Sequence, residues 1–127
     1  MILDDLLDIL ETEGFGTIGE NLIYNYMIDE PNDIIVATLL PGFPFNPKIN
    51  DVKYTIQFTI RNIDYDLAYK QVVAIANLFD NGVTRFRLAP SGRKLVSSVA
   101  SPPSLVNIDK SHRAVFSVRL HVTTNRD

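Results

Sequence analysis

The most regular pattern in the chain is a strict alternation of apolar and polar residues from 53 to 61. The apolar members are Tyr54, Ile56, Phe58 and Ile60, and the polar members are Lys53, Thr55, Gln57, Thr59 and Arg61. A period of two predicts a strand with one buried face. Residues 114–123 repeat it, with Phe116, Val118, Leu120 and Val122 facing in and Ser117, Arg119, His121 and Thr123 facing out. We therefore expect Arg61, Arg119 and His121 on an exposed polar sheet face.

A helix is predicted directly after the first of these strands. From residue 65 the apolar spacing becomes helical, and one face collects Tyr65, Ala68, Tyr69, Val72, Ile75, Ala76 and Phe79. Asp64 is suited to cap the start of this helix, and Asn81-Gly82 is suited to a left-handed end. Because so few residues link strand and helix, the helix must fold back across the strand's apolar face.

The remaining segments complete one sheet and one further helix. In chain order they are a helix at 2–12, strands at 22–27 and 34–40, a strand at 83–88, a hairpin turn at 90–93, and a return strand at 95–100. Pro102-Pro103 is expected to end that strand, and residues 105–113 to form a loop. The sequence thus predicts a single domain over residues 1–127. Its fold is α+β, with two helices packed on a mostly antiparallel sheet in the order α-β-β-β-α-β-β-β.

Two loops bear on function. The letters of residues 14–19 match a dinucleotide-binding loop, but a helix rather than a strand enters it, so we assign the glycines to a helix end and a turn. Residues 41–47 contain three prolines together with Phe43 and Phe45, which predicts a stiff, extended loop. Its aromatic rings either cap the core or dock on a neighbouring subunit.

The charges are divided unevenly along the chain. Residues 1–33 hold nine acids, Asp4 and Asp8 among them, and no Lys or Arg, whereas residues 34–127 hold all twelve bases, Arg85 and Arg87 among them, and six acids. The split has two interpretations: ordinary solubilising charge, or an acidic face of one copy that meets a basic face of the next. No apolar run approaches the roughly 18 residues of a membrane span, so no membrane partner is expected.

Candidate chemistry is sparse. The chain has no cysteine, and His112 and His121 lack the partners that a zinc site needs. Asp64 and Asp66 resemble a carboxylate pair, but helix capping accounts for both. No nucleophile elbow, phosphate-binding loop or calcium loop is present. We therefore expect no catalytic residues, no cofactor and no metal, and a subunit of an assembly rather than an enzyme.

The chain resembles the small tail-terminator proteins of tailed bacteriophages with long non-contractile tails, often called minor capsid proteins. The residues that carry the resemblance are the acidic start Leu3-Asp4-Asp5-Leu6, the segment Gly16-Thr17-Ile18-Gly19-Glu20-Asn21-Leu22-Ile23, the strand and helix from Tyr54 to Phe79, and the ending from Ser101-Pro102-Pro103 through Arg113 to Val122. The likeness spans nearly the whole chain but rests on pattern and order rather than on a rigid motif.

The resemblance implies a homohexameric ring that caps the tail tube, halts its polymerisation and joins it to a head-side connector or stopper protein. Its expected location is the virion tail or neck, and the host cytoplasm during assembly, with DNA only as cargo passing through the channel. Alternatives are another neck component, such as a head-completion or connector protein, and a small ligand-binding domain or enzyme. The candidate subunit-interface residues are Asp4, Asp8, Phe43, Phe45, Arg61, Arg85, Arg87, Arg119 and His121.

Overall fold

The computed structural model describes residues 2–41, 51–80 and 87–125. The elements in chain order are α1 (Ile2–Thr12), β1 (Leu22–Tyr24), β2 (Ile34–Leu40), β3 (Asp51–Asn62), α2 (Tyr65–Phe79), β4 (Arg87–Leu88), β5 (Lys94–Ile108) and β6 (Ala114–Asn125). This is the predicted α+β order, and it is confirmed. Neither helix is long and apolar enough to cross a membrane, as far as the described residues go.

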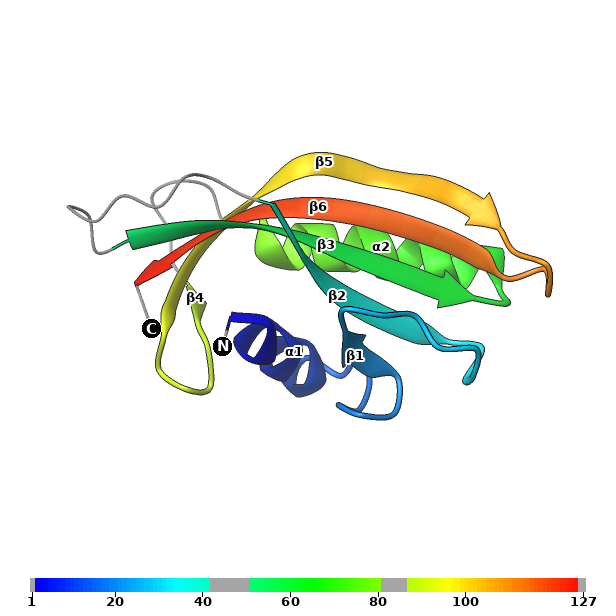
Figure 1. Ribbon diagram of the computed structural model, residues 1–127, viewed down its shortest axis with the longest axis horizontal. Coiled ribbons are helices and arrows are strands. Elements are labelled where there is room, and N and C mark those ends of the chain that lie inside the picture. The colour runs from blue at the N-terminus through cyan, green and yellow to red at the C-terminus, as the bar shows by residue number, and fades with distance from the viewer. Residues whose placement is uncertain (1, 42–50, 81–86, 126–127) are drawn as a thin grey trace.

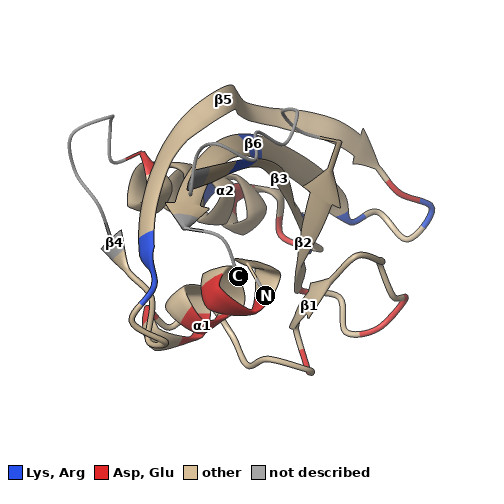
Figure 2. Cartoon of the chain, turned by 60° about the vertical axis from the view of Figure 1, so that its left-hand side comes forward, with Lys and Arg blue, Asp and Glu red and all other residues tan. Residues whose placement is uncertain are grey.

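The strands form one curved sheet in the order β1-β2-β3-β6-β5-β4. Only the β1–β2 pair is parallel, and the other pairs are antiparallel. The sheet bends around both helices, so α1 and α2 lie on its concave side (Figures 1 and 2). No helix among the described residues covers the convex side.

Local chemistry explains where the helices begin and end. The amides of Gly14 and Phe15 donate to the carbonyls of Glu11 and Leu10, and Gly14 adopts φ +85°, which is the left-handed helix end that glycine favours. At the start of α2 the Asp64 carboxylate accepts a hydrogen bond from the amide of Leu67. The glycine turn and the Asp64 cap are both confirmed, whereas Asn81-Gly82 lies outside the described residues.

One core joins the concave sheet face to both helices. Its centre includes Phe58 of β3 and Phe79 of α2, whose rings stack with centroids 5.6 Å apart. The inward residues of β3 and β6 that the alternation identified are all in this core, except that Tyr54 is only partly buried. Burial of each large side chain contributes roughly 1.5–3 kcal/mol, which fixes the register of β3 on β6 because a one-residue slip would expose the whole set.

Several sequence predictions about local structure are wrong. The strand expected at 22–27 ends at Tyr24, and the first part of the loop expected at 105–113 belongs to β5. Pro102 and Pro103 do not end a strand, because β5 runs on to Ile108 with register shifts beside them. Proline is tolerated there for two reasons: the outer side of β5 has no pairing strand beyond Leu95 among the described residues, and the register shift between Ser101 and Ser104 takes both prolines out of the regular ladder with β6. Tyr65 and Tyr69 are not buried in the core either; they are about half exposed, at 48% and 51%.

Candidate assembly surfaces

The convex face of the sheet carries a block of aligned polar side chains. Three rows cross β3, β6 and β5 in register: Thr55–His121–Ser98, Gln57–Arg119–Ser101 and Thr59–Ser117–Ser104. We call these nine residues the polar face. None of the nine is fully buried, whereas the residues that alternate with them on β3 and β6 form the core. The block holds hydroxyls, an amide, Arg119 and His121, and no acid.

Arg119 and His121 lie where the alternation predicted. Arg119 is exposed, and its Nε donates a hydrogen bond of 3.0 Å to Oε1 of Gln57 in the opposite position on β3. His121 is half-buried on the same face. Both side chains therefore lie at a broad, hydroxyl-rich surface, which suits contact with a polar partner surface.

The prediction that Arg61 shares this exposed face is wrong. Its side chain is buried, with 3% of the residue exposed. The Arg61 Nη2 donates to the carbonyls of Asp29 and Pro31, at 3.0 and 2.7 Å, and its Nε lies 3.5 Å from the carbonyl of Asn32. The physical reason is that residues 29–32 fold over the convex face at this end of β3 and cover the position.

A second buried arginine completes this attachment. Arg113, at the β5–β6 hairpin, donates from Nη1 to the Asp29 carbonyl at 2.6 Å and from Nε to Oδ2 of Asp109 at 2.8 Å. Burial lowers the pKa of Arg61, and the adjacent Arg113 charge lowers it further, while Asp109 and Asp29 act in the opposite direction. The two guanidinium groups hold residues 29–32 onto the sheet through backbone carbonyls, so this cluster serves the subunit's own fold.

The acids of α1 do not all face solvent. Asp5 is buried, and its carboxylate accepts a 2.7 Å hydrogen bond from Oγ of Ser91 and lies 3.1 Å from Nε of Arg93. This pair ties α1 to the turn before β5. Asp4 is exposed and Asp8 is half-buried, so these two candidates remain at the surface. In Figure 2 acidic positions are most numerous on α1 and near β1 and β2, and basic positions lie on β5 and β6, while the turn between β5 and β6 carries both signs.

The other candidates cannot be placed. Phe43, Phe45 and Arg85 lie outside the described residues. Arg87 belongs to β4 and pairs with Leu95 through the backbone, and only its strand position is described.

Sequence reasoning missed an apolar hollow at the β1 edge of the sheet. It has a volume of about 300 Å³ and is lined by Ile18, Gly19, Leu22, Ile23, Tyr24 and Tyr26; we call these residues the β1 hollow. Tyr26 is 66% exposed, and Ile18 and Tyr24 are each 38% exposed. The signal in the sequence was the mostly apolar and tyrosine run at 22–27. It is longer than β1, which has only three residues, so its later side chains are not needed for the strand.

A second apolar surface lies toward the other edge, where β5 passes beside the start of α2. Leu105 is paired with Phe116, and the Phe116 ring contacts Tyr65 and Tyr69 edge-on, with centroids 5.2 and 5.8 Å apart. The exposed members are Tyr65, Tyr69, Leu105, Val106 and Ile108, which we call the α2–β5 patch. It was missed because residues 105–113 were predicted to be a loop.

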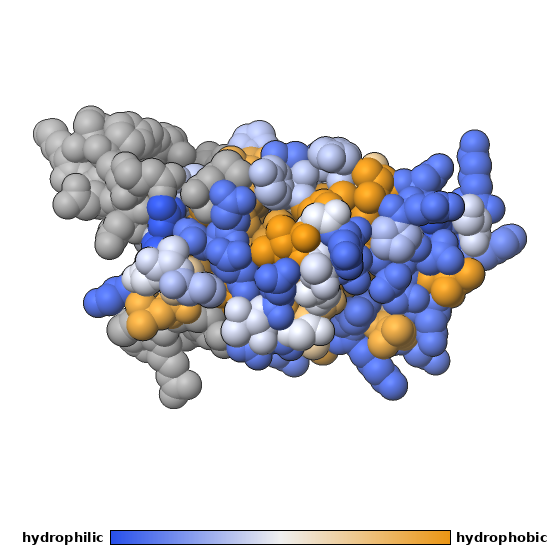
Figure 3. All heavy atoms as spheres, turned by 90° about the horizontal axis from the view of Figure 1, so that it is seen from below, coloured by the Kyte–Doolittle hydropathy of each residue, from blue (hydrophilic) through white to orange (hydrophobic). Residues whose placement is uncertain are grey.

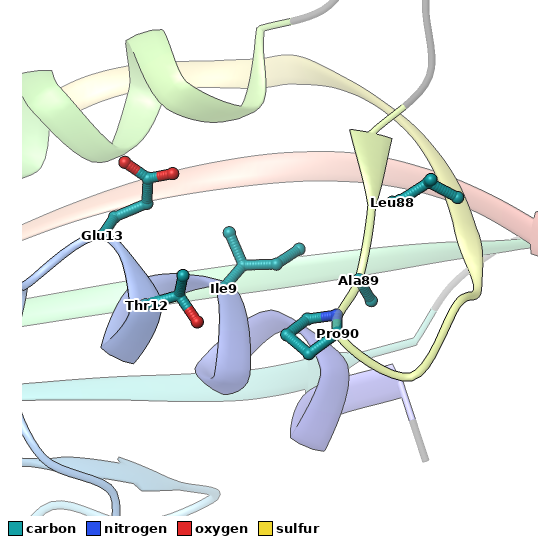
Figure 4. A pocket seen from close by; sticks show the side chains of 6 residues that line it. All are labelled: Ile9, Thr12, Glu13, Leu88, Ala89 and Pro90. Carbon is teal, nitrogen blue, oxygen red and sulfur yellow. The ribbon is translucent and has the colours of Figure 1, made fainter.

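The β1 hollow, at about 300 Å³, only reaches the lower end of the volume range typical of small-molecule pockets. A further pocket of about 160 Å³ lies between the end of α1 and the segment 88–90, lined by residues of both (Figure 4). It is smaller than the roughly 300–1,000 Å³ typical of ligand pockets. Seen from below, on the side that carries α1, apolar atoms form separate patches among polar ones (Figure 3). Among the described residues, no three His, Asp or Glu side chains could hold a metal ion.

Comparison with known proteins agrees with the resemblance seen in the sequence. The family described as bacteriophage tail terminator protein matches residues 9–126 of this chain. A search of curated proteins finds no match. One solved structure superposes with a TM-score of 0.57 at 11% sequence identity, covering 98% of this chain and 96% of its own. At that identity the likeness shows a shared fold and nothing more.

Proposed function

Because this chain belongs to the bacteriophage tail terminator family, we propose that it forms a hexameric ring that caps the completed tail tube. Membership of the family gives it a structural role in the phage tail and a location in the virion. In our proposal the ring stops polymerisation of the tube and joins the tail to a head-side connector protein. The protein acts by binding other subunits and has no catalytic function.

The observation that carries this proposal is the match to the family over residues 9–126. The structure adds two features that a ring subunit needs. A closed ring is built from a heterologous interface, so each copy must offer two different surfaces. The β1 hollow and the α2–β5 patch support this requirement, because they consist of different residues and lie toward opposite edges of one sheet.

The polar face supports the second part of the proposal. A terminator must bind the last ring of tube subunits without offering a surface on which the next ring could add. A hydroxyl-rich face with Arg119 and His121 can make many directional hydrogen bonds to a polar tube surface or line the channel through which DNA passes. The polar face gains little from purely apolar contact, so it does not favour non-specific addition of further tube rings.

The test is control of tube length. The tail tube protein of the same phage is polymerised in the presence and absence of this protein, and tube lengths are measured by negative-stain electron microscopy. We expect shorter tubes with a ring at one end, and six-fold rings with a central pore in the free protein. Unchanged lengths together with binding to filled heads would identify it as a head-completion or connector protein instead. A protein that stays monomeric at high concentration and on tube ends would contradict the ring.

A further inference from the structure

We infer that the ring contact is made by inserting the α2–β5 patch of one copy into the β1 hollow of the next. This inference rests on the proposed ring and assigns its two complementary surfaces. Both surfaces are apolar and open in the single subunit, with Tyr26 66% and Val106 57% exposed. Tyrosine-bearing apolar surfaces of this kind are typical of protein interfaces, since tyrosine buries a large area at low entropic cost.

The shapes of the two surfaces differ in the required way. The β1 hollow is a concavity of about 300 Å³. The α2–β5 patch is formed by exposed side chains on a strand and a helix, and Phe116 lies between them with its ring against Tyr65 and Tyr69. Since the two surfaces lie toward opposite edges of the sheet, they cannot cover each other within one subunit. A head-to-tail contact covers both in every copy.

Charge selects the occupant of the hollow. Glu20 is exposed next to Gly19 of the hollow, and residues 1–33 contain no Lys or Arg. Two hollows brought together would therefore face each other with like charges, which is unfavourable. The α2–β5 patch has charges of both signs beside it in the sequence: exposed Lys70 and Lys110, and the acids Asp64, Asp66 and Asp109. It can therefore offer a lysine to Glu20, which a second hollow cannot.

The contact is expected to use side chains rather than a continued sheet. Strand β5 has an outer side beyond Leu95 along which no described strand pairs, and it could in principle add a strand from a neighbour. Pro102 and Pro103 interrupt that side, because proline has no amide hydrogen to donate. We therefore expect β5 to contact the neighbouring copy through the side chains of Leu105, Val106 and Ile108 rather than through its backbone.

The first experiment uses two single charge substitutions, Tyr26→Glu in the hollow and Val106→Glu in the patch. We expect each variant alone to have the mass of one chain, 14.3 kDa, by light scattering, whereas the wild-type protein forms rings. A mixture of the two should give a species of about twice that mass, because each mixed pair keeps one intact hollow and one intact patch. Leu88→Glu is the matched control: Leu88 is 58% exposed but belongs to neither surface, and rings should persist.

The outcomes separate this inference from the proposed function. Rings formed by both variants would overturn the inference and leave the ring itself standing. Disruption by each variant without rescue on mixing would show a contact of identical surfaces and would also overturn it. A wild-type protein that forms no ring, alone or on tube ends, would contradict the proposed function.

A second experiment tests the contact in the intact ring, without a substitution that is meant to break the ring. The chain has no cysteine, so introduced thiols are the only ones present. With a short bis-maleimide, the Tyr26→Cys, Val106→Cys double variant should cross-link into a ladder that ends at the ring. Equal amounts of the two single variants should give dimers only when mixed. Dimers from either single variant alone would overturn the head-to-tail arrangement.

Discussion

Arg61 and Arg119 occupy equivalent positions in the strand pattern and opposite environments in the structure. Each faces the convex side of the sheet, on the neighbouring strands β3 and β6. Arg119 is exposed and makes one hydrogen bond of 3.0 Å, to the Gln57 side chain. Arg61 is 3% exposed and donates to backbone carbonyls of residues 29–32. Strand periodicity determines the face that a side chain occupies, but another segment decides whether that face is covered.

The difference has a consequence for the use of each arginine. A side chain that holds a loop of its own subunit has little surface left for a partner. Arg61 is therefore assigned to folding, and a double substitution of Arg61 and Arg119 would mix a folding defect with any effect on assembly. The two arginines have to be tested separately.

The largest effect is expected from Arg61→Ala. This change removes the donor to the Pro31 carbonyl and one of the two arginine donors to the Asp29 carbonyl, and it should lower the free energy of unfolding by about 3 kcal/mol. Arg119→Ala is the matched variant and should change it by less than about 0.5 kcal/mol. Urea unfolding followed by circular dichroism measures both. Equal losses from the two variants would contradict the contrast between a covered and an open position.

The same contrast on α1 should give a smaller effect. Asp5→Asn removes the charge that pairs with Arg93 and should cost about 1–2 kcal/mol, because the pair is largely buried. Asp8→Asn on the same helix should cost less than about 0.5 kcal/mol, since Asp8 makes no hydrogen bond or ion pair with the described residues. Thermal or urea unfolding of the two variants side by side distinguishes them. If Asp8→Asn cost as much as Asp5→Asn, the attachment of α1 through Asp5 would be refuted.

The sequence predicted the elements well and the edges poorly, for a physical reason. Periodicity reports burial on the protein's own core, so the bounds of α1, β2 and α2 and the inward residues of β3 and β6 were correct. Periodicity carries no information about contacts between segments far apart in the chain. Residues 29–32 cover the convex face at Arg61, and for that reason the prediction that Arg61 is exposed was wrong. Pro102-Pro103 predicted a strand end because proline cannot donate to a ladder, yet β5 continues past them through an irregularity in its pairing with β6. Tyr65 and Tyr69 fit the helical pattern although their rings only border the core.

The contribution of the Asp109 charge to stability should be smaller than the effects of the substitutions above, and it should change only at acidic pH. The pKa of Asp109 lies below its ordinary value, first because the Arg113 amide donates to its carboxylate at 3.0 Å. Desolvation opposes this shift, and the Arg113 side chain and the Ser111 amide add to it. A depressed folded-state pKa means that the stabilisation is complete above the unfolded value of about 3.9 and is lost as the pH falls through the folded value.

Asp109→Asn isolates this contribution. Above about pH 5 the variant should be less stable than the wild-type protein by a constant amount, and the gap should narrow as the pH falls below about 4. Urea unfolding between pH 7 and pH 2.5 measures the gap. A gap that is independent of pH over that range would show that the Asp109 charge does not help to hold the hairpin.

The smallest effect on folding is expected from Arg119→Glu, and it is the variant that decides what the polar face does. The side chain is exposed and its only hydrogen bond among described residues is to Gln57, so the free energy of unfolding should change by less than about 0.5 kcal/mol. If the ring is held by the β1 hollow and the α2–β5 patch, light scattering should still show intact rings. A folded Arg119→Glu monomer would instead place the polar face in the contact between subunits. Rings that form normally but no longer shorten tubes would place that face against the tube, because a reversed charge there would then meet the tube protein rather than another copy of the ring subunit.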